Sequence, residues 1–104
     1  MTISEFQRLI RDIYFTKDRR RGVDGTFRWL TEEVGELARG LRQDNPDNLR
    51  EEFADVFAWL VSLASLKGID LEAACAKYAP GCPKCHSIPC NCQEKPGSKE
   101  AERP

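Results

Sequence analysis

Apolar side chains recur at steps of three and four residues through most of the first 79 residues, which is the spacing of amphipathic α-helices. We expect four helices, at about residues 3–15, 26–41, 49–67 and 70–78. The charged stretch 17–25, which contains two glycines, is expected to be a loop, and 44–48 a turn. No strand pattern precedes residue 79, so the predicted fold class is all-α, a bundle of about four helices.

Short polar side chains and a glycine indicate where these helices begin and end. Asp24 or Thr26 is expected to cap the second helix, and Asp47 or Asn48 the third. Gly68 suits the C-terminal cap of the third helix.

The composition changes after Ala79. Residues 80–92 are rich in cysteine and lack helical periodicity, whereas 93–104 are charged and polar and are expected to be disordered. We therefore expect a helical domain at 1–79, a cysteine-rich knuckle at 80–92 and a disordered tail at 93–104.

The chain is short, with 104 residues, and nearly neutral, with 16 basic and 17 acidic side chains. A chain of this size often gains stability by forming oligomers. The charge balance argues against general nucleic-acid binding, which depends on an excess of Lys and Arg. No apolar run has the length of a membrane span, and the first residues do not resemble a signal peptide, so we expect a cytoplasmic protein.

Two of the expected helices carry matching pairs of carboxylates, Glu33 with Glu36 and Glu52 with Asp55. On a helical wheel these four flank the apolar stripe of their helix, whereas the neighbouring Glu32 and Glu51 lie opposite it and face water. Carboxylates from two helices repel one another unless cations hold them, and hard oxygen ligands suit Mg²⁺ or Mn²⁺. The pattern predicts divalent-metal chemistry on a phosphate. The apolar stripes expected to form the core are Phe27, Leu30, Val34, Leu37 and Leu41 in one helix, and Leu49, Phe53, Val56, Phe57, Leu60 and Ala64 in the other.

Aromatic and basic residues near these acids are candidates for substrate binding. Trp29 and Trp59 fall on the acidic flanks, where they could stack on a nucleobase or pack at a subunit interface. Arg19 and Arg21, in a basic run with Lys17 and Arg20, are candidate phosphate contacts, because guanidinium groups match phosphate geometry. A basic run of this kind is also common in a solvated loop.

Four cysteines, Cys82, Cys85, Cys90 and Cys92, fall within eleven residues. Four thiolates, or three with a histidine such as the neighbouring His86, make a tetrahedral Zn²⁺ site. A redox-active or disordered thiol tail is the competing interpretation. Cys75, in the last expected helix, is expected to be a small buried residue.

The segments Glu32-Glu33-x-x-Glu36 and Glu52-x-x-Asp55 resemble the paired signature of the MazG-like nucleotide pyrophosphohydrolases, within the all-α NTP pyrophosphatase superfamily. The resemblance covers about residues 1–79. It implies hydrolysis of a nucleoside triphosphate between its α- and β-phosphates to a monophosphate and pyrophosphate. It also implies assembly as a homodimer or homotetramer.

The same resemblance implies roles for individual residues. Glu33, Glu36, Glu52 and Asp55 would hold Mg²⁺. Independently of the resemblance, a carboxylate that is not fully used as a ligand could accept the proton of the attacking water, and Glu33 and Glu36 are the candidates. Lys77 would reach the phosphates, although the Pro80-Gly81 pair that follows departs from the family pattern.

Two other classes of protein are alternatives to a nucleotide pyrophosphohydrolase. A non-enzymatic helical adaptor could use a zinc knuckle to bind a partner. A di-iron bundle fits poorly, since it needs Glu-x-x-His pairs and the one histidine, His86, lies outside the expected helices.

Overall fold

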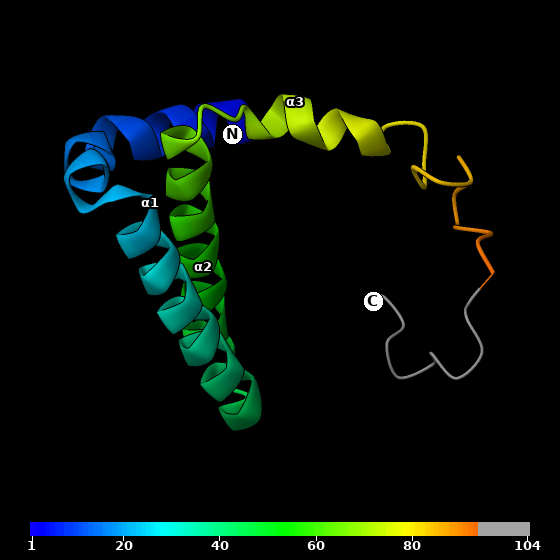
Figure 1. Ribbon diagram of the computed structural model, residues 1–104. Coiled ribbons are helices and arrows are strands. Elements are labelled where there is room, and N and C mark those ends of the chain that lie inside the picture. The colour runs from blue at the N-terminus through cyan, green and yellow to red at the C-terminus, as the bar shows by residue number, and fades with distance from the viewer. Residues whose placement is uncertain (94–104) are drawn as a thin grey trace. The chain divides into compact units, whose positions relative to one another are not determined.

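The computed structural model describes residues 1–93, in which all regular structure is helical and no strand occurs. The elements are α1 (Ile3–Gln43), α2 (Pro46–Leu66), α3 (Leu71–Cys75) and a short 3₁₀ helix, η1 (Ala76–Tyr78) (Figure 1). The chain forms two compact units, Met1–Ala74 and a second that begins at Cys75. The all-α fold class is confirmed. Except for Gln93, the tail expected to be disordered lies outside the described residues.

Helix α1 runs through the stretch 17–25 that was expected to be a loop, so that prediction is wrong. The break is confined to Gly22, whose φ of 85° and ψ of 174° lie in a region that is essentially restricted to glycine. The charged residues before it are good helix formers and continue the helix up to that point. Asp24 and Thr26 consequently lie inside α1 and cap nothing.

The cap of α2 lies two or three residues before the expected Asp47 or Asn48. Asn45 caps α2, with its side-chain oxygen accepting from the amides of Asp47 at 3.1 Å and Asn48 at 3.4 Å. Pro46 occupies the first turn, where a missing N–H costs nothing, so α2 begins earlier than predicted. At its other end, Gly68 closes the helix as expected.

Helix α2 packs against both halves of α1 (Figure 1). The second half of α1 lies alongside α2 and approaches it closely at the buried Gly40, where a Cβ would lie 3.4 Å from the Leu49 side chain. The first half crosses the C-terminal end of α2. There the Gln7 amide donates to Ser65 Oγ at 3.1 Å, and the Phe6 and Phe57 rings stack at 5.3 Å.

The core of the first unit is small, and most of the apolar stripe expected to be buried is exposed. Leu30 and Ala64 are buried, together with Ile10 and Val61. The two helices meet along their acidic flanks, which leaves the stripes uncovered in a single chain. The exposed members, from 40% to 56% accessible, are Phe27, Val34, Leu41, Phe53, Phe57 and Leu60, called the apolar face below.

Within the described residues, none of the helices is both long enough and apolar enough to cross a membrane.

Candidate active site

Three carboxylates predicted from the sequence converge between α1 and α2. Glu33 from α1 and Glu52 and Asp55 from α2 each offer an oxygen, and these oxygens all lie within 4.8 Å of one another. Glu36, one turn from Glu33, is outside this close set, and its Oε2 lies 3.6 Å from Arg39 Nη1. The Arg39 side chain is 60% exposed and that of Glu36 is 45% exposed, so the pair constrains Glu36 weakly.

The electrostatics of this carboxylate cluster are unfavourable for the protein alone. Desolvation raises the pKa of Glu33, and the negative charges of Asp55, Glu52, Glu36 and Glu32 raise it further. Glu52 Oε2 is fully buried and has no hydrogen-bond partner among the described residues. A buried carboxylate oxygen without a partner is costly, and a cation is a ligand that satisfies it. The donor set, composed of carboxylate oxygens, fits Mg²⁺ or Mn²⁺.

Glu32 and Glu51 are exposed, as the helical wheel predicted. Asp55 is exposed as well, whereas Glu33, Glu36 and Glu52 are partly buried. The cluster is therefore open to solvent on the Asp55 side and closed on the Glu52 side.

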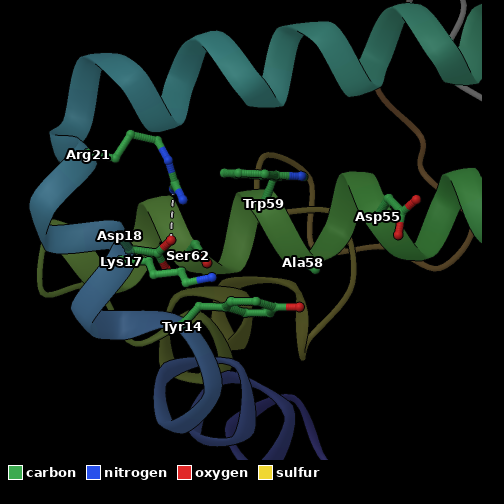
Figure 2. A pocket seen from close by; sticks show the side chains of 8 residues that line it. All are labelled: Tyr14, Lys17, Asp18, Arg21, Asp55, Ala58, Trp59 and Ser62. Atoms are coloured by element: carbon green, nitrogen blue, oxygen red, sulfur yellow. Dashed lines mark hydrogen bonds and ion pairs between the residues drawn. The ribbon is translucent and has the colours of Figure 1, made fainter.

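A pocket of about 260 Å³ adjoins Asp55 (Figure 2). Helix α1 contributes the cationic groups of the pocket, Lys17 and Arg21, and α2 contributes the Trp59 indole and the Asp55 carboxylate. The lining residues are Tyr14, Lys17, Asp18, Arg21, Asp55, Ala58, Trp59 and Ser62.

Arg21 is fixed in this pocket by three contacts. Its Nη1 donates to Oδ1 of the buried Asp18 at 2.8 Å and to Thr26 Oγ1 at 3.3 Å, and its guanidinium lies 4.7 Å over the Trp59 ring. The dashed contact in Figure 2 is the pair with Asp18. Gly25 allows this conformation, because a Cβ there would lie 2.6 Å from Arg21 Cγ. Arg21 is thus held rigidly in the pocket that Asp55 also lines.

The two tryptophans stack on each other, with ring centroids 6.0 Å apart and an interplanar angle of 17°. Trp59 lines the pocket, whereas Trp29 does not and is about half exposed. The pair presents an aromatic surface next to the carboxylates, which is suited to stacking on a nucleobase.

Two of the other predicted site residues are not among those that line this pocket. Arg19 lines a separate hollow with Phe15, Thr16 and Arg20, and its guanidinium lies 5.9 Å over the Phe15 ring. Lys77 is an exposed residue of η1, in the second unit.

Tyr14, Asp18 and Ser62 line the pocket although they were not among the predicted site residues. Tyr14, Lys17, Asp18 and Arg21 follow the i, i+3, i+4, i+7 spacing of a single helix face. The signal was therefore present, and it was lost because residues 17–25 were assigned to a loop.

The sulfur atoms of Cys82, Cys85, Cys90 and Cys92 also lie within 4.8 Å of one another. Amide groups of Asn91 and then Ser87 lower the pKa of Cys85 to about 6, whereas the neighbouring thiols, that of Cys90 first, raise the pKa of Cys92 to about 12. Four thiols this close cannot all ionise without a cation. Cys75, which was expected to be buried, is exposed on the short α3 and belongs to no such group among residues 1–93.

The fold and the cluster define an all-α domain in which acidic side chains from two neighbouring helices converge next to a pocket lined by aromatic, basic and acidic side chains. The model of the MazG nucleotide pyrophosphohydrolase domain matches residues 21–86, more than half of the chain, and the protein belongs to this family. The matched segment contains all four predicted magnesium ligands and Lys77, and it ends before Cys90 and Cys92. Comparison with curated proteins found no match.

Proposed function

We propose that the protein is a Mg²⁺-dependent nucleoside triphosphate pyrophosphohydrolase that cleaves between the α- and β-phosphates. The observation that carries this proposal is the convergence of Glu33, Glu52 and Asp55, with the buried Glu52 Oε2 lacking a partner, inside a segment that matches a nucleotide pyrophosphohydrolase domain. Family membership alone gives the class of activity, and the cluster supplies the reason for a divalent cation.

Glu33, Glu52 and Asp55 would hold Mg²⁺, or Mn²⁺ in its place, and Glu36 lies one turn away for a further contact. When bound, such an ion neutralises phosphate charge and lowers the pKa of a water molecule. Because Asp55 is exposed and also lines the pocket, it connects the carboxylate cluster to the place where the substrate would bind.

The reaction needs a base for the attacking water. The oxygen of the water would bond to the α-phosphorus. At the same time the bond from that phosphorus to the α,β-bridging oxygen would break, which releases pyrophosphate and a nucleoside monophosphate. Glu36 lies outside the close set and is the carboxylate left to accept the proton of the water; Glu33 is the other candidate.

The pocket would hold part of the nucleotide. Its volume of about 260 Å³ is below the roughly 300–1,000 Å³ of typical small-molecule sites. Lys17 and Arg21 supply positive charge for the phosphates, and Arg21 retains donors beyond those used with Asp18 and Thr26. The stacked pair of Trp29 and Trp59 would supply the aromatic surface for the base. Lys77 would add a phosphate contact by analogy with the family.

The apolar face supports assembly as a homodimer or larger homo-oligomer. Phe27, Val34 and Leu41 repeat every seven residues along α1, and Phe53, Phe57 and Leu60 form a matching line on α2. Two such lines on adjacent helices form an apolar surface of the kind that proteins bury against a partner.

The activity can be tested by incubating the full-length protein with a panel of ribo- and deoxyribonucleoside triphosphates, with Mg²⁺ or with EDTA, and measuring both products. We expect equal amounts of pyrophosphate and monophosphate from at least one nucleotide with Mg²⁺, and none with EDTA. Asp55→Asn should lower kcat by at least about 100-fold, since it weakens the stabilisation of several kcal/mol that a bound metal provides.

Glu51→Gln is the matched control, because Glu51 is exposed on the same helix and lies outside the cluster. Its kcat should stay within about twofold of the unchanged protein, in line with the small effect of most surface substitutions. Release of orthophosphate alone, or no hydrolysis of any nucleotide by folded protein, would contradict the proposal and favour a non-enzymatic adaptor.

A further inference from the structure

The cysteine cluster in the second unit has the dimensions of a tetrahedral metal site. The sulfur atoms of Cys82 and Cys92 are 3.7 Å apart, and those of Cys85 and Cys90 are 3.9 Å apart. Four thiolates around Zn²⁺, each at about 2.3 Å, would have sulfur atoms separated by about 3.8 Å. The observed spacing leaves room for one ion at the centre.

The backbone around the cluster is arranged to hold the sulfurs in place. The Cys82 amide donates to the Ser87 carbonyl at 3.1 Å, and the His86 amide donates back to the Cys82 carbonyl at 2.6 Å, which closes a tight loop. His86 takes a left-handed φ of 61° in this loop. Gly81 has a φ of 114°, and a Cβ there would lie 2.9 Å from the Ser87 carbonyl oxygen, so only glycine fits.

Backbone amides also point at the sulfurs. The amide of Asn91 donates to Cys85 Sγ at 3.2 Å, and that of Cys92 donates to Cys90 Sγ at 3.3 Å. Such donors stabilise a thiolate more than a thiol, and this kind of hydrogen bond orients and tunes metal ligands.

No apolar core accounts for the shape of this loop. Within its described part, the second unit buries only Gly81, and Ile88 is 81% exposed. A segment this short ordinarily needs a disulfide or a metal to stay folded. The cysteines are free, and their sulfurs are much farther apart than the roughly 2.05 Å of a disulfide.

We propose that Cys82, Cys85, Cys90 and Cys92 bind one structural Zn²⁺ ion as four thiolates. The site is closed, since all four positions are filled by protein ligands, so the ion stabilises the knuckle and takes no part in hydrolysis. His86 is exposed and lies outside the group of four, which excludes it as a ligand in this arrangement. The site is independent of the proposed function, because its last two ligands lie beyond the matched family domain.

The test uses the full-length protein, purified without chelator, with metal measured by mass spectrometry and coordination by the visible spectrum after Co²⁺ substitution. We expect about one zinc per chain and a tetrahedral tetrathiolate cobalt spectrum. Cys85→Ser and Cys90→Ser should each lower zinc affinity by at least about 100-fold. Loss of a residue that only supports a ligand costs roughly 10–100-fold, and loss of a ligand itself should cost at least as much as the upper end of that range.

Two control variants match these substitutions. Cys75→Ser removes an exposed cysteine outside the cluster, and His86→Asn removes the imidazole while tolerating the left-handed backbone. Both should keep one zinc per chain. The proposal would be overturned by zinc-free protein with reactive thiols, by two disulfides in place of metal, or by zinc loss in His86→Asn equal to that in Cys90→Ser.

Discussion

Glu33 lies where burial and neighbouring acids oppose its negative charge, and the pKa of its carboxyl group is raised as a result. In the metal-free protein the folded state therefore holds this proton more tightly than the unfolded state. The stability that protonated Glu33 contributes is fully present below its ordinary pKa of about 4.5 and is lost as the pH rises through the raised value.

Glu33→Gln removes that charge, so the metal-free variant should be more stable than the unchanged protein at pH 7. The difference should disappear below about pH 4.5, where Glu33 is protonated in both states. Urea unfolding midpoints in EDTA across this pH range would measure it. Mg²⁺ should stabilise the unchanged protein and should stabilise the variant less, because the variant lacks one proposed ligand. Glu51→Gln should match the unchanged protein throughout, and a metal-free Glu33→Gln variant less stable than it at pH 7 would contradict this account.

At the scale of single residues, the shared helix face of the carboxylates was predictable. Residues three apart lie on one face of a helix even where the predicted helix boundaries are slightly wrong. Glu33, Glu52 and Asp55 do converge, as the wheel suggested. Arg21 could be proposed as a basic residue but not placed in a pocket. Its position depends on the buried Asp18 and on the space at Gly25, and both are tertiary properties.

Among the elements, the kink in α1 depends on one residue. Gly22→Ala should destabilise the protein by about 1–3 kcal/mol, because its φ and ψ lie in a region that other residues avoid. Hydrolysis should fall as well, since Lys17 and Arg21 precede the kink whereas Glu33 follows it. Urea denaturation with turnover measured in parallel would show both effects.

Gly35→Ala is the matched control. Gly35 is exposed in the regular part of α1, with open space where a Cβ would be placed. Alanine there should stabilise the helix by roughly 0.5–1 kcal/mol. If the Gly22→Ala variant were as stable as the unchanged protein, the kink would not require glycine and the prediction would be wrong.

The element boundaries show what a local pattern can and cannot give. The third expected helix corresponds to α2, with its cap predicted two or three residues too late, and the short fourth is split into α3 and η1. The loop expected at 17–25 is wrong because neither the charged run nor Gly25 ends the helix. Gly22 leaves helical geometry, but Gly25 stays helical and its missing Cβ makes room for a side chain.

At the scale of the whole molecule, the apolar face predicts association. The protein should sediment as a dimer or larger species at micromolar concentration, and its thermal unfolding midpoint should rise with protein concentration. Leu60→Glu, which puts a charge into the apolar face, should shift the distribution toward monomer.

Ile13→Glu provides the control, since Ile13 is also exposed but lies outside the apolar face, on the first half of α1. It should leave the sedimentation coefficient unchanged. A folded, active monomer whose unfolding midpoint is independent of concentration would contradict the prediction.

The wheel identified these apolar residues correctly but assigned them to the interior of one chain. A sequence pattern indicates that one face of a helix is apolar, but it does not indicate whether the same chain or another copy of the chain covers that face. Here α1 and α2 meet along their acidic flanks, with Gly40 allowing the close approach, so the more apolar stripes remain open.

Glu33 belongs to α1, and Glu52 and Asp55 belong to α2, so each chain supplies these three acids by itself. If the proposed function holds, a substitution of one of these acids inactivates the active site of its own subunit and leaves the active site of the neighbouring subunit intact. In a cell that carries two versions of the gene, activity would then follow the proportion of intact chains, and the defective version would behave as recessive.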